Sequence, residues 1–279
     1  RAKYPLKILL KISGIARATY YFYTSKEDKD LKNQDIIEKI KKIFHANKKR
    51  YGYRRITLEL KNQGIIVNHK KVLRLMNKFN LQSITRKRRK YSSYQGTIGR
   101  IADNHIKRNF EANRPNEKWF TDVTEFNLRG TKLYLSPILD AYGRYIVSYN
   151  VSTSPSSFQV IDMLNKAFND NPNIDNLIVH SDQGWQYQHS FYTKRLEEKN
   201  IIQSMSRKGN SLDNGLMESF FGVMKSEMFY GQENNYKDIK ELKAAIEEYI
   251  DYYNNKRIKV KLKGLTPASY RNQSLLIKN

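Results

Sequence analysis

The spacing of apolar residues divides the chain into a helical first part and a mixed second part. Over the first 80 residues the apolar positions recur at helical spacing, as in the run from Ile36 to Phe44, which is typical of a small helical bundle. Gly14 separates two short apolar runs and indicates a helix–turn–helix over residues 7–21. Asn68 is placed to cap a further helix. We therefore expect residues 1–81 to form a small all-α region.

A different periodicity begins at Trp119, where β-rich runs replace the helical spacing. Strands are expected at 119–127, 132–140 and 144–152, joined by tight turns at 129–130 and 141–143. Further elements are predicted in the order helix 157–168, strand 176–180, helix 189–199, strand 201–205, helix 212–230 and helix 237–255. Three antiparallel strands followed by alternating helices and strands indicate an α/β domain, to which we assign residues 118–255.

The charge of the chain is strongly positive and unevenly distributed. The net charge is +24, and residues 1–118 hold 31 Lys and Arg against 9 Asp and Glu, whereas residues 119–279 hold 20 against 18. An excess of this size predicts a polyanionic partner, here double-stranded DNA. A generally basic protein is the alternative, but it does not predict the asymmetry. Residues 1–118 are therefore expected to bind DNA.

Two segments without apolar periodicity carry many basic residues. Residues 82–117 include the basic run 86–90 and are interpreted as a basic linker that lies along DNA phosphates; a bare flexible tether is the alternative. Residues 256–279 carry six Lys and Arg up to Arg271 and no acid. We interpret this stretch as a basic C-terminal tail and a second DNA contact.

The composition excludes several kinds of site. There are no cysteines, so neither disulfides nor thiolate zinc sites can form. The five scattered histidines do not supply a zinc-binding N-terminal domain. The chain has no run of 18 apolar residues and no secretory signal, so we expect no membrane contact and a cytoplasmic location.

Three carboxylates stand in contexts where an acid is unusual. Asp122 lies in the apolar run 119–124, Asp182 ends the apolar run 177–182, and Glu218 lies in the helical-looking stretch 213–221. An ionised carboxylate in an apolar strand is costly unless it is paired or metal-bound. If the fold brings the three groups together, they favour a site for a hard divalent cation.

The stretch around Glu218 has a two-sided helical pattern. Glu218 and Lys225 fall on one face, and Leu216, Phe220 and Val223 fall on the other. The apolar face can pack on a sheet while Glu218 points toward the site. Lys225 is placed to meet a phosphate, although a Glu and a Lys at this spacing also occur on ordinary solvated faces.

Several short sequence motifs of this chain occur together in one known family. The segments 119–124 (WFTDVT), 180–184 (HSDQG) and 206–210 (SRKGN) running on to Glu218 resemble the catalytic core of bacterial insertion-sequence transposases of the OrfB type, which have a retroviral-integrase-like DDE core. The words 51–55 (YGYRR) and 265–267 (LTP) also match, so the resemblance spans nearly the whole chain. It implies a ribonuclease H-like catalytic core preceded by a small all-α, helix-turn-helix-like DNA-binding region.

The resemblance also implies a catalytic and metal-binding role for Asp122, Asp182 and Glu218. These acids would hold two Mg²⁺ ions, for which Mn²⁺ would substitute, with Asp122 shared between the ions. Two such ions can activate an attacking oxygen and stabilise the leaving oxygen of a phosphodiester. Water would attack in the first step and a DNA 3′-hydroxyl in the second, so no protein nucleophile is needed.

The same resemblance and the charge pattern indicate side chains for DNA contact. The loop before the Glu218 helix is expected to be mobile and to hold the DNA strand end; a plain solvent loop with Ser211 or Asp213 as a helix cap is the alternative. The DNA-binding candidates are Lys225, Arg207, Lys208, Asn210, Arg54, Arg55, Arg86, Lys87, Arg88, Arg89 and Lys90.

Other conspicuous residues receive structural interpretations. His180 could act as a general base, but a structural role beside Asp182 is favoured. Asp140 precedes a turn, where Asp commonly makes local hydrogen bonds, and it is not assigned to the metal site. Tyr51 and Tyr53 are left open between stacking on DNA and packing in the core.

The predicted function is that of a DNA transposase which binds terminal inverted repeats and catalyses metal-dependent cleavage and strand transfer. The implied partners are element ends and target DNA, a second copy of the chain in at least a dimer, and an upstream-frame protein or fusion. The implied location is the cytoplasm of a bacterium, at the nucleoid. The alternatives are a metal-dependent DNA nuclease and a catalytically silent DNA-binding repressor.

Overall fold

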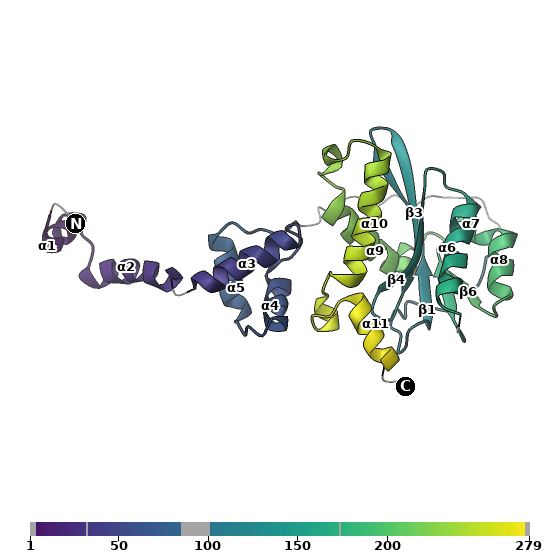
Figure 1. The fold of residues 1–279 in the computed structure, drawn as a ribbon, viewed down its shortest axis with the longest axis horizontal. Coiled ribbons are helices and arrows are strands. Elements are labelled where there is room, and N and C mark those ends of the chain that lie inside the picture. Colours follow the sequence, from purple (N-terminus) through teal and green to yellow (C-terminus); the bar gives the residue numbers. More distant parts are fainter. Residues whose placement is uncertain (1–3, 32, 85–100, 173, 277–279) are drawn as a thin grey trace. The chain divides into compact units, whose positions relative to one another are not determined.

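The chain forms two compact units, residues 1–83 and 84–279. The computed structural model describes residues 4–31, 33–84, 101–172 and 174–276, and Figure 1 colours them along the sequence. In the described residues the first unit is helical, whereas the second combines helices with a six-stranded sheet.

The described part of the first unit is built from helices alone. These are α1 Leu6–Ser13, α2 Arg17–Leu31, α3 Gln34–Ala46, α4 Tyr53–Asn62 and α5 His69–Lys78. α3, α4 and α5 pack on one another, and their apolar stripes form a core that includes Ile40, Ile56 and Val72. Asn68 caps α5 as predicted, because its side chain accepts a 2.8 Å hydrogen bond from the Lys70 N–H. The helices expected over 7–21 are present, and α4 is a helix that the apolar pattern did not indicate.

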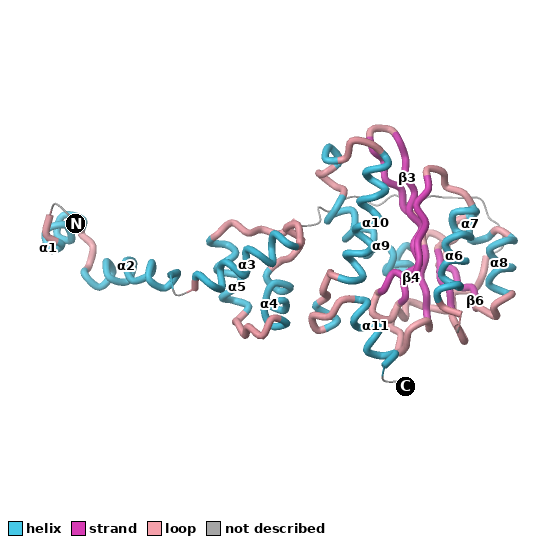
Figure 2. The backbone as a smooth tube through the Cα atoms, viewed as in Figure 1, coloured by secondary structure: helices cyan, strands magenta, loops and turns pink. Residues whose placement is uncertain are grey.

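The sheet of the second unit has an antiparallel part and a parallel part. Its strands are β1 Lys118–Thr121, β2 Thr124–Leu128, β3 Thr131–Asp140, β4 Tyr145–Ser152, β5 Ile178–Ser181 and β6 Ile202–Met205. β1 and β2 lie end to end along one side of β3, and β4 lies along the other side, all antiparallel to β3. On its far side β1 pairs with β5, and β5 with β6, in parallel. Figure 2 shows these strands as a layer between helices.

The strand expected at 119–127 is interrupted at Asp122 and Val123, between β1 and β2. Both strands keep one register against β3, in which Thr121 lies opposite Ile138 and Asp122 therefore lies opposite Pro137. Proline has no N–H, so it cannot donate a ladder hydrogen bond to Asp122. The hydrogen-bond ladder is therefore interrupted at Asp122. The carboxylate of Asp122 accepts a 2.8 Å hydrogen bond from the Val123 N–H.

Helices cover both faces of the sheet. α6 Ser157–Asp170, α7 Trp185–Gln188 and α8 Ser190–Glu197 lie on one side, and α9 Gly215–Met228, α10 Ile239–Asn255 and α11 Pro267–Leu276 lie on the other (Figure 1). α6 packs on β3 and β4, α8 on β6, α9 on β1, and α10 on β3 and β4. An antiparallel three-stranded part followed by alternating helices and parallel strands is the order of a ribonuclease H-like fold. The predicted fold class is thereby confirmed.

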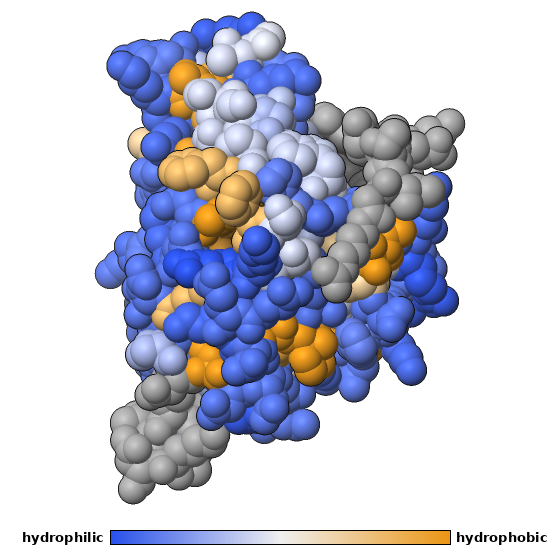
Figure 3. Space-filling view, turned by 90° about the vertical axis from the view of Figure 1, so that its right-hand side faces the viewer, coloured by the Kyte–Doolittle hydropathy of each residue, from blue (hydrophilic) through white to orange (hydrophobic). Residues whose placement is uncertain are grey.

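The surface of the second unit is mainly polar where α7 and α8 lie. Figure 3 shows this side as hydrophilic, with several separate apolar patches, which is the usual condition of a protein surface. Among the helices that the structure describes, none is long and apolar enough to cross a membrane.

The stretch 256–279, expected to be a basic tail, is largely folded onto the second unit. Arg257 is 4% exposed and its Nη2 lies 2.6 Å from Glu227 Oε1, and the Tyr249 hydroxyl donates to the same carboxylate at 2.9 Å. α11 brings Arg271 to the buried carboxylate of Asp140. Both arginines are therefore structural, which corrects the interpretation of the whole stretch as a DNA contact.

Part of the segment expected to be a linker also packs on the second unit. Ile106 is buried, and the His105 N–H donates a 3.0 Å hydrogen bond to Ser204 Oγ on β6. Residues 101–117 thus contribute to the packing of this unit. The basic run 86–90 lies outside the described residues, so its role on DNA stays a prediction.

Arg257→Ala is expected to lower the free energy of unfolding by about 3–5 kcal/mol, because it leaves the Glu227 carboxylate buried without its cation. Lys256→Ala is the matched control, since the exposed Lys256 pairs with Asp251 at 3.8 Å and such pairs contribute only about 0–1 kcal/mol. Denaturant unfolding of the two variants measures the difference. Equal unfolding midpoints for both would contradict a structural role of Arg257.

Candidate active site

The three acids come from three elements that meet at one edge of the sheet. β1 and β5 are parallel neighbours with Phe120 opposite His180. Asp122 directly follows β1 and Asp182 directly follows β5, so both lie at the carboxyl-terminal edge, where open α/β sheets commonly form their sites. Glu218 lies in the first turn of α9, which packs on β1.

Charge repulsion links the three carboxyl groups. Burial raises the pKa of Asp122 well above its usual range, and the charges of Asp182 and then Glu218 raise it further, while Lys225 and the Val123 N–H act in the opposite direction. Burial also raises the pKa of Asp182. Asp122 therefore interacts electrostatically with both of the other acids.

Neutral donors hold the two aspartates in place. Asp122 Oδ1 accepts the Val123 N–H at 2.8 Å, and its Oδ2 accepts from Asn214 Nδ2 at 3.2 Å. Asp182 Oδ1 accepts the Gly184 N–H at 2.9 Å. These bonds orient the carboxylates but leave their negative charges in place.

The carboxylate oxygens of the three acids are the ligands that a hard cation prefers. Within the part of the chain that the structure describes, no three His, Asp or Glu side chains gather at metal-binding separation. Asn214, which contacts Asp122, also has a buried Oδ1 without a hydrogen-bond partner among the described residues. Carboxylates that repel one another and an amide oxygen without a hydrogen-bond partner suit a divalent cation, because such a cation brings positive charge and binds oxygen ligands.

Tyr187 is a further residue of this region that the sequence did not indicate. It is fully buried, and its hydroxyl lies 3.4 Å from Thr121 Oγ1. Burial, followed by the charges of Asp122 and Asp182, raises its pKa well above the usual value, so Tyr187 stays neutral. One tyrosine among 20 in the chain gives no sequence signal of such a position.

His180 has the structural role that was favoured for it. Its ring is buried, and Nε2 lies 3.1 Å from the carbonyl oxygen of Asp213, which can only accept, so Nε2 carries the proton. Nδ1 lies 2.8 Å from Ser204 Oγ and accepts from it. Burial lowers the pKa of His180 to about 4, so the ring is neutral at pH 7.

The packed face of α9 differs from the predicted one. Phe220 is buried as expected, but Leu216 and Val223 are only half-buried. The apolar residues that pack inward are Met217, Phe220, Phe221, Met224 and Met228. The shift arises because the helix contacts both the sheet and α10, so its apolar surface is wider than one stripe.

Lys225 is anchored beside the acids. Its Nζ donates a 2.7 Å hydrogen bond to the Glu125 carbonyl and lies 5.0 Å from the centroid of the Phe126 ring. It also favours the charged form of Asp122. A phosphate would have to compete with the Glu125 carbonyl, and the DNA contact of Lys225 stays a prediction.

The loop expected to be mobile is anchored at two points. Arg207 donates to Asp213 from Nε at 2.8 Å and from Nη2 at 2.9 Å. Asn210 Oδ1 accepts from Arg108 Nη2 at 3.3 Å. Lys208 is exposed. Asp213, considered only as a helix cap, is thus an ion-pair partner.

In the first unit the residues 50–55 separate into buried and accessible groups. Tyr51 is buried with the Arg55 guanidinium 5.6 Å from its ring centroid, which assigns Tyr51 to the core. Arg55 also donates to the Arg50 carbonyl at 3.2 Å. Arg54 is exposed and lies over the half-buried ring of Tyr53. Arg54 therefore presents its charge more openly than Arg55.

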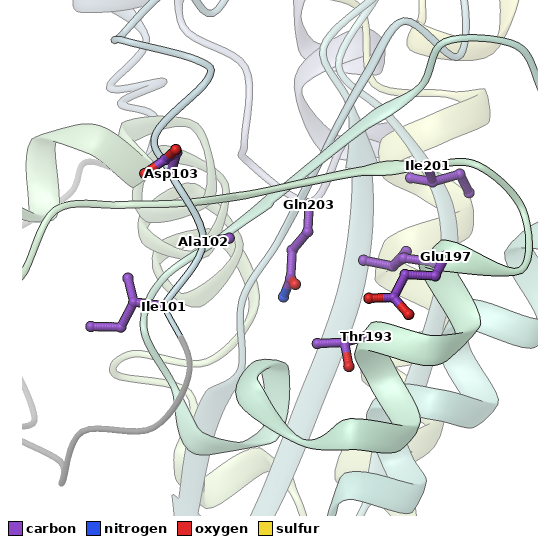
Figure 4. Close-up of a pocket in the computed structure, with 8 residues that line it drawn as sticks. Ile101, Ala102, Asp103, Thr193, Glu197, Ile201 and Gln203 are labelled. Carbon is purple, nitrogen blue, oxygen red and sulfur yellow. The ribbon is translucent and has the colours of Figure 1, made fainter.

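A cavity of about 320 Å³ lies away from these groups, between residues 101–103, α8 and β6. Thr193, Glu197 and Gln203 contribute polar side chains to its lining (Figure 4). None of the three acids lines it, so we do not assign it to the candidate site.

Family models match the chain in three places. Integrase core domain models match residues 112–211 and residues 218–275, and an HTH-like domain model matches residues 30–89. The first integrase segment contains Asp122 and Asp182, and the second begins at Glu218. The HTH-like match covers α3 to α5, whereas the sequence pattern had indicated a helix–turn–helix at 7–21.

Relatives match over most of the chain. It is 48% identical over 277 residues to the putative transposase InsK for insertion sequence element IS150 of Escherichia coli K12, covering 99% of this chain and 96% of that protein. It is 36% identical to the transposase for insertion sequence element IS904 of Lactococcus lactis, covering 84% and 92%. Among solved structures it is similar to the HTLV-2 integrase catalytic core domain in complex with magnesium, with a TM-score of 0.48, 18% identity, and coverage of 58% of this chain and 99% of that one.

The fold and the core-domain matches define a polynucleotidyl transferase core of the transposase and integrase class. The 48% identity to the IS150 transposase along nearly the whole chain then identifies the family within this class. The chain belongs to the family of insertion-sequence transposases, of the OrfB type with a retroviral-integrase-like core, which confirms the predicted resemblance.

Asp122→Asn is expected to stabilise the metal-free protein at neutral pH. The pKa of Asp122 is raised by folding, so the folded protein holds the proton to higher pH, and stability falls as pH rises from the unfolded value of about 4 through the folded one. The variant lacks this penalty, and each kcal/mol recovered raises the melting temperature by about 2–4 °C. Thermal unfolding in chelator at neutral pH and at pH 4 measures the gain, which should shrink in acid. A lower melting temperature at neutral pH would contradict the prediction.

His180 is expected to contribute stability that disappears on acidification. Its folded pKa of about 4 lies below the ordinary 6.5, so the unfolded chain takes up the proton first, and stability present above pH 6.5 falls toward pH 4. The shift corresponds to about 3 kcal/mol. His180→Gln should flatten this part of the pH–stability curve. Denaturant unfolding of the wild type and the variant from pH 4 to 7 tests this, and parallel curves for the two proteins would refute it.

Proposed function

We propose that this transposase cleaves the ends of its element and joins their 3′ ends to target DNA, with Asp122, Asp182 and Glu218 as the catalytic acids. The observation that supports this best is their placement. Two acids follow neighbouring parallel strands, the third lies in the first turn of α9, and Asp122 interacts electrostatically with both others. In cleavage, a water oxygen attacks phosphorus and the bond to the 3′ oxygen breaks. In joining, the freed 3′-hydroxyl attacks a target phosphorus and displaces another 3′ oxygen.

The chain's own hydrogen bonds prepare the acids for this role. Val123 and Asn214 bind both oxygens of Asp122, and Gly184 binds Asp182. A Cβ at position 184 would come within 2.9 Å of Asp182 Oδ1 and 2.6 Å of Gln186 Nε2, so glycine permits the close approach. Carboxylates that are already oriented need little rearrangement when charge develops on the reacting phosphate.

The three acids would hold two divalent cations, Mg²⁺ or Mn²⁺, for which their oxygen donors and mutual repulsion are suited. When bound, such ions activate the attacking oxygen and stabilise the leaving oxygen. Tyr187 remains neutral beside both aspartates and adds no competing charge. Lys225 adds positive charge beside Asp122 and is proposed to lie near a DNA phosphate.

The first unit is proposed to bind the terminal inverted repeats. The HTH-like match over 30–89 and the excess of Lys and Arg in the first 118 residues support this assignment. Arg54 and Arg55 are proposed DNA contacts of this unit, and Lys208, Asn210 and the run 86–90 are proposed as separate DNA contacts elsewhere in the chain. Work on two element ends requires at least two copies of the chain, and an upstream-frame protein is a further proposed partner.

Asp122→Asn, Asp182→Asn and Glu218→Gln should each reduce strand transfer by on the order of 10²–10³-fold or more, while DNA binding persists. The reason is that each change removes one proposed ligand charge and leaves the basic surface intact. The assay incubates labelled, pre-cut element ends with Mg²⁺ and measures joined product. Glu198→Gln is the matched control, because Glu198 is an exposed acid of the same unit that pairs with Arg195.

The outcomes separate the alternatives. A near wild-type rate in any of the three variants would remove that acid from the site. Hydrolysis of ends without joining would favour the nuclease, and binding without any reaction by the wild type would favour the repressor. Metal binding has its own measurement, since Mg²⁺ or Mn²⁺ should raise the melting temperature of the wild type and not that of Asp122→Asn.

A further inference from the structure

Two arginines from distant segments share one buried carboxylate. Asp213 is 0% exposed and lies in η1 Ser211–Asn214, the short turn that leads into α9. Arg207 donates to it from Nε at 2.8 Å and from Nη2 at 2.9 Å, and Arg108 donates from Nε at 2.9 Å. Asn104 Nδ2 adds a 3.0 Å hydrogen bond. Asp213 therefore joins the segment 104–108 to the loop that precedes α9.

The charges of this cluster do not balance. Two guanidinium groups face one carboxylate, which leaves one net positive charge. The hydrogen bonds from Arg207 hold the pKa of Asp213 well below its usual range, so the carboxylate is ionised. The side chains of Arg108 and Arg207 are 46% and 60% exposed, whereas that of Asp213 is fully covered. The negative group is thus internal, and the positive groups face solvent.

The cluster is connected to the catalytic acids on two sides. Asn214, the next residue after Asp213, donates to Asp122 at 3.2 Å. The Asp213 carbonyl accepts from His180 Nε2 at 3.1 Å, and His180 lies two residues before Asp182. The pair of arginines is therefore fixed to the same framework as the carboxylates.

We propose that Arg108 and Arg207 form a phosphate-binding site for the DNA strand that the catalytic acids engage, with Asp213 as the residue that positions them. This rests on the proposed function and adds Arg108, which is not among the individual side chains predicted to contact DNA. A guanidinium presents its N–H donors in a planar fork that suits phosphate oxygens. Arg207 is already held by Asp213 through Nε and Nη2. Arg108 is held by Asp213 through Nε and by Asn210 through Nη2. Less side-chain freedom is therefore lost when a phosphate binds.

The rival explanation is that the cluster only stabilises the fold. Salt dependence separates the two, since each phosphate neutralised by a protein cation contributes a slope of about −0.9 to log affinity against log salt. A purely structural ion pair contributes to melting temperature and not to this slope. The measurement uses the full chain without divalent cations, so that no chemistry occurs, and a duplex carrying the terminal repeat of the element that encodes this chain.

Arg108→Gln and Arg207→Gln should each flatten the salt slope by about 0.9, which is about a threefold smaller loss of affinity between about 50 and 200 mM salt. Arg108→Lys and Arg207→Lys keep the charge and should keep the slope. Arg195→Gln is the matched control, because Arg195 is a 44% exposed arginine of α8 that pairs with Glu198 and not with Asp213. Its slope should equal that of the wild type.

Two results would overturn the proposal. One is a wild-type slope in both Gln variants. The other is an equal loss of slope in the Lys and Gln variants, which would show that the fold and not the charge had changed. Failure here leaves the proposed function standing if element ends are still joined in Mg²⁺. Conversely, a chain that shows the expected slopes but joins no ends would retain the phosphate site and lose the strand-transfer assignment.

Discussion

The charge interaction between Asp122 and the two other acids of the site is the constraint on which this edge of the sheet depends. Asp122 and Asp182 follow adjacent parallel strands, and Glu218 lies in the first turn of α9, so three acidic side chains meet at one sheet edge. Neutral donors, namely two backbone N–H groups and the amide of Asn214, orient the two aspartates. These hydrogen bonds fix the direction of each carboxylate without adding an opposite charge, which suits a site proposed to receive cations and a phosphodiester.

The buried acids of this unit differ from the half-buried acids of the site. Asp140 is paired with Arg271, Glu227 with Arg257, and Asp213 with Arg108 and Arg207. Arg271, Arg257 and Arg108 each reach an acid far away in the sequence, and each comes from a segment that the charge pattern had assigned to a DNA contact or to a linker. These arginine-paired acids hold the fold together, whereas Asp122 and Asp182 of the candidate site accept hydrogen bonds from neutral N–H donors. The partner of a carboxylate, together with its burial, thus distinguishes the two kinds of acid.

Much of this organisation could be predicted from the sequence, because it depends on short-range patterns. The helical first part, the ribonuclease H-like order of elements and the three acids with their flanking words all follow from local periodicity and from the resemblance. What could not be predicted depends on contacts between distant residues. The break at Asp122 requires knowing that Pro137 lies opposite, the structural roles of Arg257 and Arg271 require knowing which carboxylates they reach, and Tyr187 shows its proximity to the aspartates only once α7 is placed. A count of Lys and Arg cannot distinguish a cation on DNA from one inside the protein.

The proline opposite Asp122 also limits how this sheet can evolve. A central strand normally gains from β-branched residues, so a change of Pro137 to valine would look favourable by strand propensity. Such a residue would bring back an N–H facing Asp122, however, and the ladder could close across the gap between β1 and β2. The acid would then lie within a continuous strand, with its backbone held in the pleat. A residue that improves the sheet at position 137 would therefore impair the placement of Asp122. Proline at this position keeps the interruption between β1 and β2 that frees the acid from the strand.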